Sequence, residues 1–168
     1  VFGTDEGLSF PHVTSLLEDR EGNIWVGTYA GGLNSLREAA FVTYGARDGL
    51  RAEVALSVLQ DRLGYVWVGT MQGLYRMHGE EVVPFAGMEH VDQIAVTGMF
   101  QDRAGALWVG TFGQGLYRFL DGQWRRWSME DGLPANYVFA VAEDADGELW
   151  VGTQKGLCRL VGGAFQQA

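Results

Sequence analysis

The chain has 168 residues, of which 47% are hydrophobic, and its 12 basic and 21 acidic side chains give a formal net charge of -9. This acidic balance argues against nucleic acid and anionic membrane surfaces as partners, because both require clustered lysine and arginine side chains. The single cysteine, Cys158, excludes an internal disulfide framework, and 25 glycines with only three prolines favour short strands joined by tight turns.

The sequence contains no candidate for a membrane span. No stretch approaches the roughly 18 consecutive apolar residues that would cross a bilayer. The chain starts with Val1-Phe2-Gly3-Thr4, which has neither an initiator methionine nor the pattern of a signal peptide. We therefore expect no membrane contact from this chain and interpret it as an excised piece of a longer protein.

The dominant feature is a repeat of Trp-Val-Gly-Thr. Its four copies begin at Trp25, Trp67, Trp108 and Trp150, which are 42, 41 and 42 residues apart. A fixed period of roughly 40 to 50 residues with strand-like units is typical of a propeller or an array of stacked units. The other elements are therefore assigned in register with this period.

Each repeat begins with a predicted first strand and a tight turn. The strands are apolar runs with one small residue at a matched position, at 13–18, 55–60, 96–101 and 138–143. Each is followed by Asp-x-x-Gly, in which aspartate accepts hydrogen bonds from its own turn and glycine supplies a positive φ. The turn carrying Asp144, Asp146 and Glu148 could suggest a calcium loop, but the other copies lack the additional acids, so we interpret it as a turn.

Three further strands complete each repeat. The second is the Trp-Val-Gly-Thr stretch with one preceding apolar residue, and its glycine allows a neighbouring sheet to approach closely. The third begins at a Gly-Leu pair, and the fourth carries apolar residues three positions apart. A return loop of the Asp-Gly-Leu type then leads to the next repeat, although the third copy departs from this pattern at Glu89-His90-Val91.

Units of about 42 residues with four strands are too small to bury both faces of a sheet, so they stack radially. We predict an all-β fold, a β-propeller of four-stranded antiparallel blades with four blades per chain. The whole chain, 1–168, forms one unit with blades near 9–44, 51–85, 92–127 and 134–168. We assign Trp25, Trp67, Trp108 and Trp150 to the core and expect Trp67→Ala to cost about 3 to 5 kcal/mol of stability.

Together, the Trp-Val-Gly-Thr, Asp-x-x-Gly and Asp-Gly-Leu elements resemble the two-component regulator propeller repeat, over essentially the whole chain. Members of this family resemble one another in being seven-bladed extracytoplasmic sensor domains. They are fused to histidine kinases or diguanylate cyclases, and many of them sense oligosaccharides. The resemblance implies ligand sensing and a periplasmic or other extracytoplasmic location. The sequence itself contains no kinase or cyclase module.

The number of repeats bears on how the ring closes. Phe2 and Ala168 occupy the same position of the period, so the chain holds four whole repeats and no segment that completes a blade across the junction. Blade faces adapted to seven blades suit eight blades better than four. We therefore expect a homodimer that forms one eight-bladed ring, with a closed four-bladed monomer as the alternative.

Candidate ligand-binding residues lie in two sets of loops at one end of the blades. We call the loops before the first strands the lead-in loops and those between the second and third strands the mid-blade loops. Their sequences vary while the strands repeat, as expected of a binding surface. Aromatic residues could stack on a sugar ring, and polar neighbours could supply hydrogen bonds. The candidates are His12, Tyr29, Gln72, Phe112, Gln114, Asn136, Tyr137 and Lys155.

The sequence gives little support to catalysis. The histidines, His12, His78 and His90, fall at different positions of the repeat, which argues against a shared metal site, and we expect no cofactor. The main prediction is a non-enzymatic ligand-binding sensor module that self-assembles. Two alternatives stay open: a purely structural fragment, designed or ancestral, and a propeller lyase or glycosidase in which His12, Glu53 and Tyr137 converge.

Overall fold

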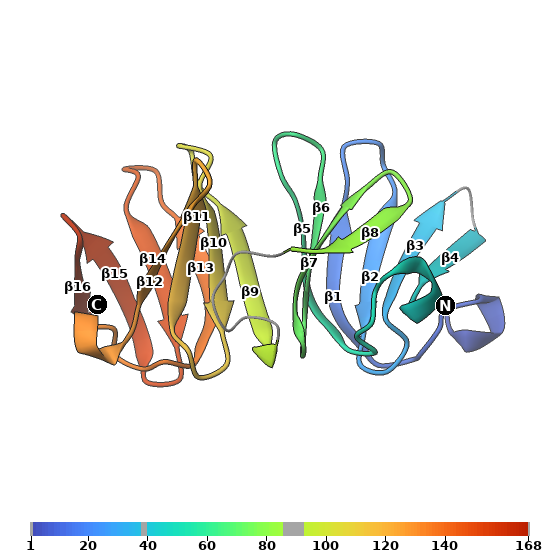
Figure 1. The fold of residues 1–168 in the computed structure, drawn as a ribbon, viewed down its shortest axis with the longest axis horizontal. Coiled ribbons are helices and arrows are strands. Elements are labelled where there is room, and N and C mark those ends of the chain that lie inside the picture. Colours follow the sequence, from blue (N-terminus) through green and yellow to red (C-terminus); the bar gives the residue numbers. More distant parts are fainter. Residues whose placement is uncertain (1, 38–39, 86–92, 168) are drawn as a thin grey trace. The chain divides into compact units, whose positions relative to one another are not determined.

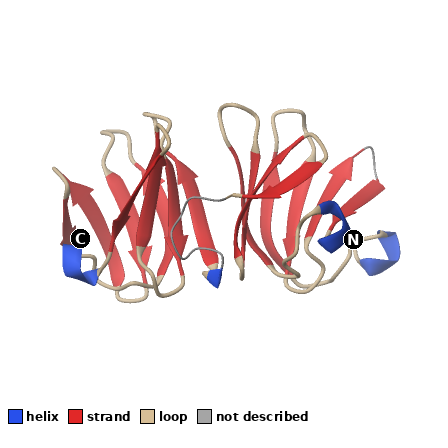
Figure 2. Cartoon of the chain, in the orientation of Figure 1, coloured by secondary structure: helices blue, strands red, loops and turns tan. Residues whose placement is uncertain are grey.

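The computed structural model describes residues 2–37, 40–85 and 93–167, which form four antiparallel sheets of four strands each (Figures 1 and 2). Within every sheet the strands pair in sequence order, as in the blade of a propeller. This confirms the predicted all-β propeller fold with four blades in the chain. The divergent third return loop, Glu89 to Val91, lies outside the described residues.

The chain divides into two compact units, which are described separately. Unit 1, Val1–Gln93, holds the first two blades, and unit 2, Ile94–Ala168, holds the third and fourth. The strands of unit 1 are β1 Val13–Glu18, β2 Ile24–Thr28, β3 Leu33–Arg37, β4 Ala40–Tyr44, β5 Ala55–Gln60, β6 Val66–Thr70, β7 Gly73–His78 and β8 Glu81–Pro84. Those of unit 2 are β9 Val96–Gln101, β10 Leu107–Thr111, β11 Leu116–Leu120, β12 Gln123–Trp127, β13 Val138–Glu143, β14 Leu149–Thr153, β15 Gly156–Val161 and β16 Ala164–Gln167.

The return loops contain single turns of 3-10 helix, at η1 Thr4–Glu6, η2 Ala46–Asp48 and η4 Met129–Asp131. Each turn ends at a glycine with a positive φ, for example 98° at Gly49. The leucine that follows is buried in each case, at Leu8, Leu50 and Leu133. The Asp-Gly-Leu signature thus reverses the chain and anchors the loop with one apolar side chain.

The Asp-x-x-Gly turn is tied to the tryptophan of the next strand. In the second repeat, Asp61 Oδ1 accepts hydrogen bonds from the backbone N–H groups of Leu63 and Tyr65, at 2.9 and 3.0 Å. Its Oδ2 accepts a bond from Trp67 Nε1 at 2.7 Å. The same aspartate-to-tryptophan bond, 2.7 to 2.8 Å long, recurs in the other three repeats. One carboxylate therefore fixes both the hairpin turn and the orientation of the indole ring.

Each blade has two chemically different faces, because successive side chains of a strand point to opposite sides. The tryptophan face carries the repeat tryptophan and the leucine of the third strand, such as Trp25 and Leu33 in the first blade. The valine face carries the valine of Trp-Val-Gly-Thr and its neighbours across the strands, such as Val68 and Tyr75 in the second blade.

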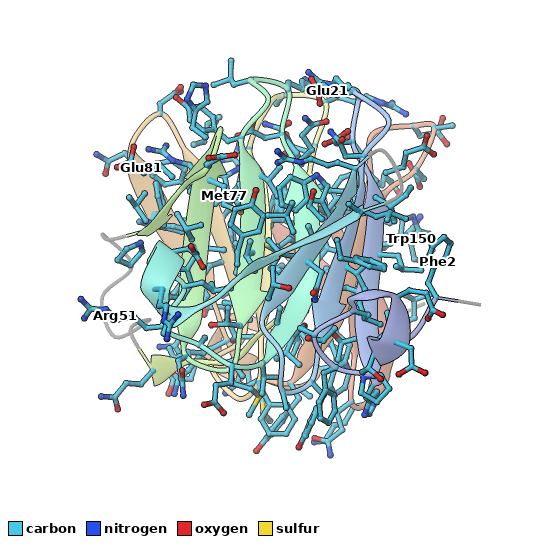
Figure 3. The ribbon with its side chains drawn as sticks, turned by 90° about the vertical axis from the view of Figure 1, so that its right-hand side faces the viewer. Phe2, Glu21, Arg51, Met77, Glu81 and Trp150 are labelled. Atoms are coloured by element: carbon cyan, nitrogen blue, oxygen red, sulfur yellow. The ribbon has the colours of Figure 1, made fainter. Side chains whose placement is uncertain are left out.

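In unit 1 the tryptophan face of the first blade packs on the valine face of the second. Trp25, Leu33 and Tyr44 share one core with Ala55, Val66, Val68, Tyr75, Met77 and Val82. Figure 3 shows Met77 among the strands of this unit, whereas Glu21 lies at the turn end. The first strands β1 and β5 also contact each other.

Unit 2 repeats this arrangement. Trp108, Leu116 and Trp127 of the third blade share a core with Val138, Val141, Leu149, Val151 and Cys158 of the fourth. A Cβ atom at Gly110 would lie 2.8 Å from Val138 Cγ1 and 3.0 Å from Val138 O. Glycine is needed there because the next sheet approaches the backbone directly, as expected from the sequence.

The four repeat tryptophans are not equally buried. Trp25, Trp67 and Trp108 are almost fully buried, whereas Trp150 is only partly buried. Trp150 lies on the tryptophan face of the fourth blade, which no other blade of unit 2 covers. Trp150 therefore departs from the core position expected for it, although its indole N–H is satisfied by Asp144.

Candidate functional site

The lead-in and mid-blade loops lie at the same end of each blade and are joined by backbone hydrogen bonds. In every repeat, the residue after the second strand donates its N–H to a carbonyl directly before the first strand. These bonds are Tyr29 to His12, Met71 to Val54, Phe112 to Ala95 and Gln154 to Tyr137, with lengths from 2.9 to 3.2 Å. The loops are therefore extensions of the blade, and their side chains have a defined position.

In unit 1 the structure brings His12 and Tyr29 together. Their rings are stacked, with centroids 5.3 Å apart and planes inclined by 17°. Both side chains are exposed. Gln72, the third candidate of this unit, is held through its backbone N–H by Thr70 Oγ1 at 3.0 Å, and its side chain is exposed on the second blade.

In unit 2 the structure brings Phe112 and Tyr137 together across the junction of the third and fourth blades. Their rings meet edge to face at a centroid distance of 4.6 Å, and their backbones form a single β-bridge. The N–H groups of Gly113 and Gly115 donate to Asn136 O at 3.1 and 2.9 Å. Phe112 is more than half exposed, so this aromatic pair offers an apolar surface to solvent.

The polar candidates of unit 2 are held through different atoms: Asn136 through its side chain, and Gln114 and Lys155 through their backbones. Asn136 Oδ1 accepts a hydrogen bond from Met129 N at 2.9 Å, and Gln114 O accepts one from Arg126 Nε at 2.7 Å. Lys155 donates its backbone N–H to Thr153 Oγ1 at 3.2 Å. Its side chain and that of Gln114 are exposed.

A cavity of unit 1 lies at the opposite, turn end of the first two blades. It has a volume of about 430 Å³, and its lining includes Asp19, Asn23, Trp25, Gln60 and His78. Burial favours a higher pKa for Asp19, but hydrogen bonds from Asn23 and Trp25 outweigh it and lower the pKa below the usual value. The polar groups of Asp19 are thus used by the turn and by the Trp25 indole, and they are not free to bind a ligand.

A grouped metal site is not found in the part of the chain that the structure describes. Among residues 2–37, 40–85 and 93–167, no group of three or more histidine, cysteine, aspartate or glutamate side chains could hold a metal ion. His90 lies outside these ranges. Glu53 is exposed on the lead-in loop of the second blade, in unit 1 with His12, whereas Tyr137 belongs to unit 2.

Sequence reasoning missed the polar residues that join neighbouring blades. The Arg20 guanidinium donates to the carbonyls of Asp61 and Arg62 on the next blade, both at 3.0 Å. Arg103 likewise donates to the carbonyls of Asp144 and Ala145, at 2.8 and 2.9 Å. The available signal was an arginine directly after the turn aspartate in three of the four repeats, with Ala145 in the fourth.

Threonine hydroxyls form a second set of bonds between blades. Thr14 Oγ1 donates to Ala55 O, and Thr97 Oγ1 donates to Val138 O. In each unit these bonds join the first strand of one blade to that of the next. The fourth blade has Phe139 at this position.

Comparison with known proteins gives the same assignment as the motifs. A model of the two component regulator propeller family matches residues 7–30, 91–113 and 132–155, which fall in the first, third and fourth repeats. A search of curated proteins found no match. None of the described residues forms a helix that is long and apolar enough to span a membrane.

Several solved structures are similar to this chain. One is the extracellular domain of a putative hybrid two-component system from B. thetaiotaomicron, with 25% identity and a TM-score of 0.83 over 94% of this chain and 22% of that chain. Another, from a putative one-component system of the same organism, has 21% identity and a TM-score of 0.79 over 94% of this chain and 23% of that chain. This chain therefore spans less than a quarter of their length.

A virginiamycin B lyase from Staphylococcus aureus is also similar, with 14% identity and a TM-score of 0.71 over 92% of this chain and 54% of that chain. At this identity the likeness shows the fold alone. The four in-phase repeats and the family match lead to one assignment: the chain carries repeats of the two component regulator propeller type.

Proposed function

We propose that this chain is a non-enzymatic sensor module that binds carbohydrate at the loop end of its blades, outside the cytoplasm, and that it completes a ring by pairing with a second copy. The location is supported by the two B. thetaiotaomicron structures, which are extracellular domains of sensor systems. The same two structures, which are domains of sensor systems, support the non-enzymatic part of the proposal.

The observation that carries the ligand proposal is the exposed aromatic pair of unit 2. Phe112 and Tyr137 are held in place by their own β-bridge and by the backbone bonds around Asn136, so their ring surfaces are formed before any ligand arrives. A preformed apolar surface reduces the entropy lost on binding. Sugar rings offer C–H groups to aromatic faces and hydroxyls to polar side chains, which matches an exposed Phe112 with the exposed Gln114 two residues later.

The proposal is tested by titrating the protein calorimetrically with a panel of neutral and acidic oligosaccharides. For any sugar that binds, we expect Phe112→Ala to weaken affinity by about tenfold, because one stacking contact contributes on the order of 1 kcal/mol. The matched control is Leu63→Ala, which removes an exposed apolar side chain at the turn end and should leave affinity unchanged. Unchanged affinity of Phe112→Ala would contradict the proposed site.

The enzymatic alternative has a separate test. Incubating the wild-type protein with each bound sugar and analysing the products by mass spectrometry should show no cleavage. Turnover that His12→Ala abolishes would overturn the proposal in favour of a propeller lyase or glycosidase.

A further inference from the structure

The fourth blade exposes a face that is buried in the other blades. Leu157 is 50% exposed, whereas Leu33 and Leu116, at the same position of the first and third blades, are 0% exposed. Ala140 and Ala142 on the same face are exposed, and Trp150 is only partly buried. A Cβ atom at Gly152 would meet only Ala140 of its own blade, whereas one at Gly110 would meet the neighbouring blade.

The first blade exposes the opposite kind of face. Leu16 on its valine face is 67% exposed, whereas Val141, the matching residue of the fourth blade, is 9% exposed. Val13 is 40% exposed, while Ala55 and Val138 at the same position are fully buried. The polar Asn34 on this face needs no external partner, because Ser9, Thr43 and Val26 O satisfy its amide.

The junction inside each unit shows which surface fits each of these faces. Both units bury the tryptophan face of one blade on the valine face of the next. We infer that the tryptophan face of the fourth blade binds the valine face of the first blade of a second copy, and that two such contacts close a symmetric ring of two chains. This inference rests on the proposed pairing of two copies, and it adds which blade faces make the contact.

The width of the internal junctions favours a second copy over closure of one chain on itself. In unit 1, a single apolar core runs from Ala55 in the first strand of the second blade to Tyr44 and Val82 in the fourth strands. Strands about 4.8 Å apart place the fourth about 14 Å from the first. In a four-bladed ring, neighbouring blades are about 90° apart, so their fourth strands would be about 20 Å farther from each other than their first strands. In an eight-bladed ring the angle is about 45° and this difference is about 11 Å, so a core that reaches the fourth strands fits the larger ring better.

The junction between copies lacks the polar clamp of the internal junctions. At the internal junctions Arg20 and Arg103 each donate to two carbonyls of the next blade. The corresponding residue of the fourth blade is Ala145, and Phe139 stands where the first and third blades have the threonine that bonds the next first strand. Contact between copies therefore depends on apolar burial, and the pairing is reversible and concentration-dependent.

The inference predicts both loss and gain of pairing. By sedimentation velocity from about 1 to 100 µM, we expect the wild-type protein to pass from one chain to two. Leu157→Glu and Leu16→Glu should each stay monomeric. Both side chains are exposed before pairing, so the fold tolerates a glutamate at either position.

Ala145→Arg should lower the dimer dissociation constant by about tenfold by restoring carbonyl bonds. The control is Leu63→Glu, at an exposed turn position, which should pair like wild type.

Mixing the two monomeric variants identifies the faces directly. The Leu16→Glu chain keeps an intact fourth blade, and the Leu157→Glu chain keeps an intact first blade. An equimolar mixture can form one sound contact, so it should contain a species of two chains that neither variant forms alone.

Three results would overturn the inference. A wild-type protein of one chain at every concentration would contradict pairing itself. A series of ever larger species would contradict closure by two chains. A dimer that persists in Leu16→Glu and Leu157→Glu would retain pairing but refute the assigned faces. Sugar binding by a permanent monomer would leave the ligand proposal standing, so the two proposals fail separately.

Discussion

At the scale of single residues, the fold depends on one carboxylate per repeat. Asp19, Asp61 and Asp102 are buried, and each accepts bonds from its own turn and from an indole N–H. A buried donor that loses its acceptor costs more than the bond contributes, because it cannot return to water. The aspartate is therefore as much a part of the repeat as the tryptophan six residues later.

Asp61→Ala should lower the free energy of unfolding by about 1 to 3 kcal/mol, because the Trp67 indole and two backbone N–H groups lose their acceptor. Urea denaturation followed by tryptophan fluorescence measures this change. Asp146→Ala, an exposed turn residue in the fourth repeat, is the control and should stay within about 0.5 kcal/mol of wild type. Equal effects of the two substitutions would contradict the role assigned to Asp61.

The same carboxylates predict a dependence of stability on pH. The hydrogen bond from Trp150, with the backbone bond from Glu148, lowers the pKa of Asp144 below its usual value. A carboxyl whose pKa is lower when folded stabilises the fold above its unfolded pKa of about 3.9, and this stabilisation is lost as pH falls through the folded pKa.

Urea denaturation at pH 7, 5, 4 and 3 should therefore show the free energy of unfolding decreasing at the acidic end. Asp144→Asn should show a shallower decrease than wild type between pH 4 and 3, since its side chain does not titrate. A parallel decrease in both proteins would exclude Asp144 as a contributor.

At the scale of elements, the blade is the unit of packing and its two faces are complementary. Phe100 and Trp108 of the third blade pack against a face that carries Val141 and Val151. A blade face that no other blade covers carries the same kinds of side chain but lacks the contacts between blades. The position of a repeat in the series, and not its sequence alone, therefore decides how much each residue stabilises.

Trp108→Ala and Trp150→Ala test this dependence within one unit. Trp108 is buried in the core of unit 2, so its removal should cost about 3 to 5 kcal/mol, and Trp150, which is only partly buried, should cost clearly less. Both values come from chemical denaturation at low micromolar protein, where the chains are expected to be separate. Equal costs would show that the tryptophan face of the fourth blade is covered.

At the scale of the whole molecule, the proposed ring couples stability to concentration. Pairing stabilises the folded state by mass action, so its contribution grows with protein concentration. The loops proposed to bind sugar would then be present twice around one axis.

The thermal midpoint of the wild-type protein should rise when its concentration is raised from about 1 to 100 µM, because only folded chains pair. Differential scanning calorimetry measures the midpoint, and Leu157→Glu serves as the control whose midpoint stays constant. A wild-type midpoint that is independent of concentration would contradict pairing in this range.

The sequence alone determined the blades. Strand starts at Val13, Ala55, Val96 and Val138, and the turn glycines, followed from a period of about 42 residues, because local alternation and turn chemistry act over a few residues and repeat visibly. The tertiary structure decided what the period conceals: the bond between Asp61 and Trp67, the arginine bonds between blades, the pairing of Phe112 with Tyr137, and the incomplete burial of Trp150. These features depend on which surface lies opposite a residue, and repeats that share one pattern specify that surface only through their order in space.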